Sequence, residues 1–301
     1  MGRGDALVLE LNEENRNRPI IILMDGGDHS SKGKISPFAF LNQSKWNQVD
    51  LLILTHLHHD HVVGLLEVAD NVKVTEAVMP YHPFEIEFQE VTDQKAKQSK
   101  EIFQFYQQLL QKLKQQGTNI HFRPPFADKD QWIFGEIGLR HLYPKKYDRL
   151  YAFEIIEQLA KDHNLSANEQ NGLLKQFDAM SNMDSSIWMV ENKRLKEQWL
   201  LLGGDALLPV WEQLLQSEDL RPLGLKVSHH GMKDGINEEL LRQLSPDWIL
   251  ITNHHEEYLR FRSEWERLAI SVGCELVVTG DQLDTIRVSS QLPQIPVRVK
   301  E

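Results

Sequence analysis

A chain of 301 residues is long enough to bury a large core, as one large α/β domain or two smaller ones. Its formal net charge of −11 argues against broad, nonspecific binding to a nucleic-acid backbone. A local basic groove or a phosphate bound through a metal is still compatible with this charge. The single cysteine, Cys274, excludes an intrachain disulfide and favours a reducing compartment.

Membrane and export signals are not evident in the sequence. No apolar run reaches the length of about eighteen residues that a membrane span needs. The opening stretch MGRGDALVLEL lacks the basic start and the long apolar segment of a secretory signal. We therefore expect a cytoplasmic protein.

The chain is predicted to begin with an antiparallel hairpin. Residues 5–11 and 19–24 are both strand-like and are joined by a polar stretch. The second strand leads directly into Asp25-Gly26-Gly27-Asp28, which places two carboxylates in a tight turn. Asp-Gly is ordinary turn chemistry, so this turn alone is not evidence of a functional site.

The stretch Leu51–Gly64, LLILTHLHHDHVVG, has the strongest chemical signal in the chain. Its short apolar run, bounded by polar residues, predicts a buried strand over residues 51–55. Imidazole and carboxylate side chains then crowd into six positions: His56, His58, Asp60 and His61. A lone histidine is more often structural, but this set at the end of a strand matches the ligands of a borderline divalent metal.

A helix over 62–69 and a strand over 72–79 are expected next. His82 follows this strand, and it would share a sheet edge with the metal motif if the strands are parallel. Residues 93–116 form the clearest predicted helix, with one apolar face and Gly117 at its end. Its lysines are typical of a solvated face, with a phosphate-facing patch as the alternative.

In the second half of the chain, predicted strands end in glycine, histidine or aspartate clusters. The clusters are Gly203-Gly204-Asp205, Ser228-His229-His230-Gly231 and Asn253-His254-His255. Helices and strands are expected in this order: helices 150–160 and 167–177, a hairpin of 186–191 with 198–202, helix 208–215, strands 223–227 and 248–252, helix 263–271, and strands 274–278 and 285–288. In layered α/β folds, functional groups gather at such strand ends.

These motifs resemble those of the metallo-β-lactamase-fold hydrolases. HLHHDH at 56–61 looks like the family's HxHxDH signature, and LLLGGDA at 200–206 resembles the strand that supplies its bridging carboxylate. LKVSHHG at 225–231 is similar to the last histidine motif of one subgroup. That subgroup is the hydrolase domain of ComEC, the DNA-uptake channel of competent bacteria, and its stand-alone relatives.

Further matches extend the resemblance over nearly the whole chain. GRGDALVLEL at 2–11 resembles the subgroup's opening strand, LMDGG at 23–27 its LIDxG turn, SSIWMVE at 185–191 the strand before the bridging aspartate, and residues 273–288 the closing segment. The opening strand looks short, because the chain starts almost at the GRGD turn. The resemblance implies one α/β hydrolase domain over 1–301, a four-layer αβ/βα sandwich with a helical insert at about 83–180.

The resemblance also implies a dinuclear metal centre between two sheet edges. The HLHHDH motif would supply two ligands to each metal: His56 and His58 to the first, Asp60 and His61 to the second. Asp205 would bridge the two metals. One histidine of the 229–230 pair would complete the second site; His229 is favoured, although the sequence does not separate it from His230.

One position departs from the family pattern. Many members carry another histidine just before the SSI-type strand, where this chain reads Ser181-Asn182-Met183-Asp184. The competence-type subgroup often lacks this histidine too. Asp184, Asn182 or water could supply oxygen in its place, and we count Asp184 among the candidate metal ligands.

The implied activity is hydrolysis by a hydroxide that two divalent cations activate, since bound metals lower the pKa of water to about 7. Ligation by histidine and aspartate without thiolate suits Zn²⁺ first, with Mn²⁺ or Fe as alternatives. In the family, the equivalent of Asp60 also orients the hydroxide. His230, His82 or metal-bound water would protonate the leaving group.

A phosphodiester, in a nucleotide or a nucleic acid, is the substrate that the competence-type resemblance favours. The acidic net charge weighs against a general nuclease, because phosphate affinity comes chiefly from lysine and arginine. Two alternatives remain. The same centre could hydrolyse a carboxylic ester, thioester or amide, or the chain could be a non-catalytic metal- or partner-binding module, which the missing histidine would suit.

Overall fold

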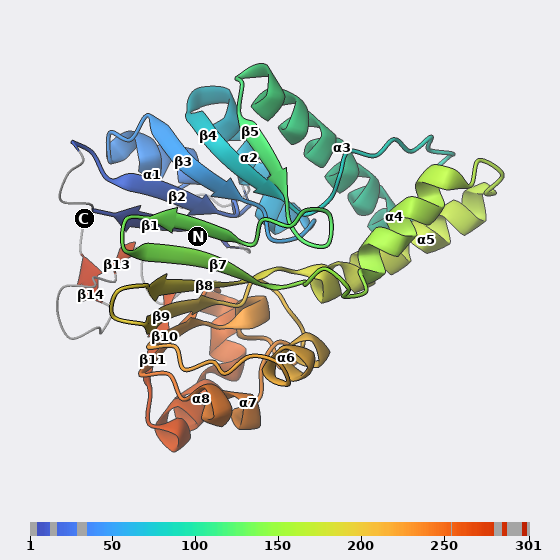
Figure 1. Ribbon diagram of the computed structural model, residues 1–301. Helices are drawn as coiled ribbons and strands as arrows, with labels where there is room; N and C mark the ends of the chain where they lie inside the picture. The colour runs from blue at the N-terminus through green and yellow to red at the C-terminus, as the bar shows by residue number, and fades with distance from the viewer. Residues whose placement is uncertain are drawn as a thin grey trace.

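The computed structural model describes residues 5–12, 17–28, 35–253, 255–279, 285–287 and 297–299. Within these ranges two β-sheets lie face to face, and helices cover their outer faces (Figure 1). The expected four-layer αβ/βα sandwich is confirmed. Parts of three expectations lie outside the described residues: positions 2–4 of the GRGD turn, His254, and positions 280–284 and 288 of the closing segment.

The first sheet has the strand order β1-β2-β3-β4-β5. Its strands are β1 (Leu7–Leu11), β2 (Ile20–Met24), β3 (Gln48–Ile53), β4 (Lys73–Met79) and β5 (Asn119–Phe122). The first two form the predicted antiparallel hairpin, and the remaining neighbours are parallel. Three helices pack on its outer face: α1 (Pro37–Gln43), α2 (His59–Asn71) and α3 (Gln94–Gln115).

The second sheet has the order β12-β11-β10-β9-β8-β7-β6. Its strands are β6 (Gln131–Phe134), β7 (Ile137–Tyr143), β8 (Ile187–Asn192), β9 (Glu197–Leu202), β10 (Gly224–Lys226), β11 (Trp248–Ile251) and β12 (Glu275–Val278). Strands from β9 to β12 run parallel. Its outer face is covered by α6 (Leu208–Leu215), α7 (Glu238–Leu244) and α8 (His255–Val272), while β13 (Thr285–Arg287) and β14 (Val297–Val299) pair separately.

Burial of the central strands on both faces explains their continuous apolar runs. In β3, Leu51 and Ile53 pack between the two sheets, where they join Trp188 of the second sheet. Leu52 and Leu54 alternate with them and pack against the helices. A third apolar cluster lies between the second sheet and α6–α8. Three apolar layers thus hold the four layers of the fold together.

The segment 83–180, predicted as a helical insert, contains three strands as well as three helices. It contains β5, β6 and β7, which pair within the two sheets. Its helices are α3, α4 (Tyr151–Lys161) and α5 (Ala167–Met180). The pair α4 and α5 extends beyond the sheets at the right of Figure 1. A short 3-10 helix, η1 (Ser181–Asp184), then leads from α5 back to β8.

Several helices begin earlier than their apolar spacing predicts. Helix α2 begins at His59, so the last two ligands of the metal motif lie on its first turn rather than in a preceding loop. Ser36 caps α1 and Asn237 caps α7, two helices that the sequence analysis did not predict. Capping side chains set the starts of α1 and α7, whereas α2 begins without a side-chain cap. Among the described residues, no helix is both long and apolar enough to cross a membrane.

The turn after β2 packs directly against α2 through two glycines. A Cβ atom on Gly64 would lie 1.8 Å from Gly26 O, and one on Gly26 would lie 2.4 Å from Leu65 N. Gly26 N also donates a hydrogen bond to His61 O at 2.7 Å. This close backbone contact brings Asp25 against His61, so a packing constraint of the fold positions a metal-motif residue.

A buried ion pair joins the two sheets. Asp5 precedes β1 in the first sheet, and Lys226 lies in β10 of the second; their side chains are 1% and 0% exposed and contact each other directly. The Lys226 ammonium also donates to Gly204 O at 2.7 Å and lies 3.7 Å from Asp205 Oδ1. Removing one partner of such a pair leaves an uncompensated buried charge.

We expect Gly64→Ala to destabilise the protein by about 1–3 kcal/mol or more, because the new methyl group has no space beside Gly26. The matched control is Gly172→Ala on α5, where a Cβ meets nothing within 4 Å and alanine should stabilise the helix by about 0.5–1 kcal/mol. Urea unfolding midpoints measure both effects. Equal midpoints for the two variants would refute the close contact.

Lys226→Met should cost about 3–5 kcal/mol in metal-free protein, because Asp5 would be left charged and buried without its partner. The double variant Asp5→Asn with Lys226→Met removes both charges and should recover most of that loss. Urea unfolding of the wild type, Lys226→Met, Asp5→Asn and the double variant gives the coupling energy between the two residues. Lys146→Met, at the exposed Lys146–Asp128 pair, should leave the midpoint unchanged. Additive single effects at Asp5 and Lys226 would contradict the pairing.

Candidate metal centre

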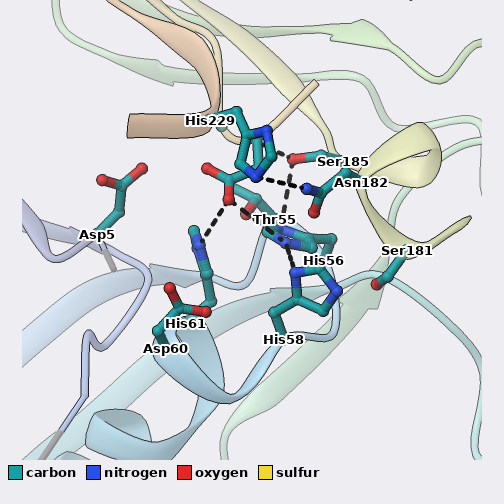
Figure 2. A network of polar contacts seen from close by, with 12 residues as sticks. Asp5, Thr55, His56, His58, Asp60, His61, Ser181, Asn182, Ser185 and His229 are labelled. Atoms are coloured by element: carbon teal, nitrogen blue, oxygen red, sulfur yellow. Dashed lines mark hydrogen bonds and ion pairs between the residues drawn. The ribbon is translucent and has the colours of Figure 1, made fainter. Parts of the chain in front are cut away.

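Strand ends of both sheets bring imidazole and carboxylate side chains together (Figure 2). The first segment is 56–61 after β3, the second is Asp205 after β9, and the third is the 3-10 turn η2 (Ser228–Gly231) after β10. Their donor atoms form two groups. The first group is His56, His58 and Asp205, and the second is Asp60, His61 and His230. Within each group the donor atoms lie within 4.8 Å of one another.

Asp205 lies between the two groups. Its Oδ2 atom is 3.9 Å from His56 Nε2 in the first group. The same oxygen is 3.3 Å from His61 Nε2 and 3.1 Å from His230 Nε2 in the second. One carboxylate oxygen therefore contacts nitrogens of both groups, which is the position of a bridging ligand.

Within each group the remaining donors also converge. His56 Nε2 and His58 Nδ1 are 3.1 Å apart. In the second group, His230 Nε2 lies 3.6 Å from Asp60 Oδ2. Asp60 is 26% exposed whereas the imidazoles of His56 and His61 are fully buried, so the cluster opens towards solvent on the Asp60 side.

The histidine nitrogens that face away from the cluster are held by hydrogen bonds. Three of them meet an oxygen that can only accept: His58 Nε2 at Asp178 O (3.1 Å), His61 Nδ1 at Asp25 Oδ2 (2.9 Å) and His230 Nδ1 at Thr252 O (3.0 Å). Each outer nitrogen therefore carries a proton, and the inner nitrogen is the one that can bind a cation.

His56 reaches the same arrangement through a hydroxyl group. Thr55 Oγ1 donates to Asp25 Oδ2 at 2.8 Å, so its lone pair is free to accept from His56 Nδ1 at 3.0 Å. Burial lowers the pKa of His56 well below its usual value, and the neighbouring imidazoles add to this effect. His56 is thus neutral, with its lone pair on Nε2.

Carboxylates control the charge of the second group. Burial disfavours protonation of His61, but Asp205 and Asp25 raise its pKa well above the usual value. Burial also lowers the pKa of His230, but Asp205 and Asp5 outweigh this effect and raise the pKa to about 10. A divalent cation would take the place of these protons, because both need the same nitrogen lone pairs.

The side chains present fit such a cation. His61 Nε2 and His230 Nε2 are buried and make no well-directed hydrogen bond to any described residue. Buried polar atoms are nearly always paired in native proteins, so two that converge on one carboxylate indicate a ligand. Imidazole and carboxylate donors without thiolate suit Zn²⁺, Mn²⁺ or Fe²⁺.

Asp184, a predicted ligand, faces another part of the protein. Its Oδ2 atom accepts hydrogen bonds from Tyr81 Oη at 2.8 Å and Phe153 N at 3.0 Å. Burial raises its pKa to about 6. Among the described residues, Asp184 belongs to none of the potential metal-binding groups.

His229 and His230 point in different directions. Both have left-handed backbone conformations, with φ angles of 49° and 53°. His230 enters the second group, whereas His229 lies at the rim, 24% exposed, with Nδ1 2.7 Å from Asp234 Oδ1. The Nε2 atom of His229 lies 3.1 Å from Asn182 Nδ2. The geometry therefore favours His230 as the ligand of this pair.

His82, a predicted proton donor, packs among aromatic rings. Its ring centroid is 4.4 Å from that of Phe122 and 4.9 Å from that of Phe126. None of the potential metal-binding groups in the described part of the chain includes it.

Asp5 and Lys226 contact the cluster although no sequence motif assigned them to it. Asp5 Oδ1 lies 3.3 Å from His230 Nδ1, and Lys226 lies beside Asp205 as described above. One feature of the sequence does indicate such a pair: the lysine inside the apolar strand of LKVSHHG. A buried ammonium group requires a buried carboxylate nearby.

Comparison with known proteins gives one family match. The model of the Metallo-beta-lactamase superfamily matches residues 21–144, a range that includes the HLHHDH motif. No curated protein matches the chain.

Two solved structures are similar to this one at low identity. A diphosphatase from the PhnP family is 8% identical, with 79% of this chain and 75% of that chain covered and a TM-score of 0.35. The Rm3 metallo-beta-lactamase is 13% identical, with coverages of 90% and 81% and a TM-score of 0.33.

The superfamily match spans the strand and the motif that supply four of the six clustered residues. The four-layer fold brings the other two, Asp205 and His230, to the same point from the second sheet. The chain therefore has the metallo-β-lactamase fold and the His/Asp cluster of a metal-dependent hydrolase, and its residues 21–144 match the superfamily's model.

Proposed function

We propose that this protein hydrolyses phosphodiesters with two divalent cations. The first cation is assigned to His56, His58 and Asp205, and the second to Asp60, His61, His230 and the same Asp205. The observation that carries the proposal is the position of Asp205 Oδ2, which contacts nitrogens of both groups. Zn²⁺ is the favoured ion, with Mn²⁺ or Fe as alternatives.

When bound, two such cations supply a nucleophile near neutral pH and stabilise negative charge on the substrate oxygens. The chain's own residues hold the geometry. Asp25, Asp178 and Thr252 fix the outer nitrogens of three histidines, so these rings need not reorient during the reaction. Asp60, on the solvent side of the cluster, is placed to orient the attacking water.

A phosphodiester substrate is favoured by two lines of support. The motifs resemble those of the ComEC-type hydrolase domain, and a two-cation centre suits in-line displacement at phosphorus, where attacking and leaving oxygens both need charge stabilisation. The net charge of −11 disfavours extended contact with a duplex. We therefore assign a nucleotide or a short single strand as the substrate.

The ligand assignment changes the source of the leaving-group proton. His230 is no longer available as a proton donor if its Nε2 atom binds a cation. His82 is packed against Phe122 and Phe126. Protonation of the leaving group is therefore assigned to water at the open side of the cluster.

Purified protein should contain close to two equivalents of metal, and Asp205→Ala should lose at least one, because both groups share this carboxylate. Elemental analysis by mass spectrometry measures the content. Asp219→Ala, at an exposed residue, is the control and should keep both metals. Unchanged metal content in Asp205→Ala would sink the bridging assignment.

Turnover of a bis-aryl phosphodiester should fall at least about 10–100-fold in His58→Ala, with Zn²⁺ and Mn²⁺ each added back. A panel of carboxylic ester, thioester and amide substrates separates the alternatives. Faster turnover on that panel would replace the phosphodiester by another substrate class. Bound metal with no turnover on any substrate would indicate a binding module instead.

The choice between His229 and His230 can be tested in a His58→Ala background, where the first site is disabled. Adding His230→Ala should remove the remaining metal, because His230 completes the second group. Adding His229→Ala should leave that metal bound, since the ring lies at the rim with Asp234. The reverse pattern would restore His229 as the ligand.

A further inference from the structure

The first group has fewer ligands of its own than the second. His56 and His58 are its only unshared members among the described residues, whereas the second group has three. We propose that the side-chain oxygen of Asn182 completes the first site, an inference that rests on the two-cation function proposed above.

Asn182 is held directly over the loop that carries the first ligands. The segment 178–186 follows residues 55–58 through a series of hydrogen bonds: Asp178 O with His58 Nε2 (3.1 Å), Ser181 Oγ to Leu57 O (2.9 Å), Ser185 Oγ with His56 Nδ1 (3.4 Å) and Ser186 N to Thr55 O (3.1 Å). Asn182 lies in the middle of this segment. In Figure 2 its amide is beside His229, on the side of the cluster where His56 and His58 lie.

A chain of hydrogen bonds fixes which end of the amide faces the site. The Asp234 carboxylate can only accept, so His229 Nδ1 donates to it. The Asn182 amide nitrogen lies 3.1 Å from His229 Nε2, so the NH₂ group is the end of the amide that faces His229. Asn182 Oδ1 is thereby turned away from His229.

This oxygen has no hydrogen-bond donor among the described residues, although it is completely buried. The whole Asn182 side chain is only 7% exposed. A buried amide oxygen without a donor is costly, and each such atom in a native protein calls for a partner. A cation at the neighbouring His56–His58 pair would supply it.

Asp184 does not compete for this role. Its Oδ2 atom accepts from Tyr81 Oη and Phe153 N, and among the described residues Asp184 belongs to none of the potential metal-binding groups. These two contacts hold the short helix in the rotation that presents Asn182 to the loop.

The ligand sets predict different affinities for the two cations. The first site would have two imidazoles, a neutral amide oxygen and the shared carboxylate. The second has two imidazoles, the shared carboxylate and a second carboxylate, Asp60. The lower negative charge and the weaker oxygen donor should make the first cation the more readily exchanged.

The test is calorimetric titration of chelator-treated protein with Mn²⁺ alone. Wild type should bind two ions in two steps. Asn182→Ala should keep the tighter step and weaken the other about 10–100-fold. Asn182→Asp, which retains an oxygen at this position, should bind both ions at least as tightly as wild type. Asn164→Ala, at an exposed asparagine outside the cluster, is the matched control and should leave both steps unchanged.

The aspartate variant also separates ligation from a purely structural role. Aspartate cannot donate to His229 Nε2, so if that hydrogen bond alone mattered, Asn182→Asp would be as harmful as Asn182→Ala, with both lowering the thermal midpoint of metal-free protein. That pattern, or two unchanged binding steps in Asn182→Ala, would overturn the inference. Wild type that binds no metal would refute the two-cation function itself.

Discussion

The structure depends on three carboxylates that are buried close together and paired with a lysine and a histidine. Asp5, Asp25 and Asp205 are each at most 2% exposed, and isolated charges at such depth would cost several kcal/mol apiece. Lys226 pairs with Asp5, and His61 lies between Asp25 and Asp205. These contacts join the two sheets at the point where the metal-motif residues converge. The same negative charge that makes this region expensive to bury is what attracts divalent cations, so the stability of the fold and the metal chemistry have one electrostatic origin.

The helices α4 and α5 take part in the centre although they lie outside the sandwich. The carboxyl end of α5 supplies Asp178 O to His58, and η1 places Asn182 beside His229. Lys95 of α3, a helix between β4 and β5, lies 3.7 Å from Asp178 Oδ2 at the end of α5. The segment between β7 and β8 therefore shapes the first metal site rather than serving only as additional core.

Much of this arrangement could be predicted from local sequence. The apolar run before His56 predicted a strand, whereas Asp205, which follows β9 of the other sheet, was linked to the motif only through the family resemblance of LLLGGDA. No motif assigned Asp5 to the cluster, and its partner, Lys226, is likewise contributed by the other sheet. Pairing between sheets depends on three-dimensional packing, and no spacing in one sequence records it.

Backbone rotation distinguishes the residues in the two choices that the sequence left open. His229 and His230 are adjacent, and their left-handed conformations direct one ring to the rim and the other to the cluster. Asn182 and Asp184 lie two positions apart in a 3-10 helix, where about three residues complete a turn, so their side chains point roughly 120° apart. They cannot both face the loop at 55–58. Tyr81 holds Asp184, and Asn182 is the residue of η1 that we propose for the first metal site.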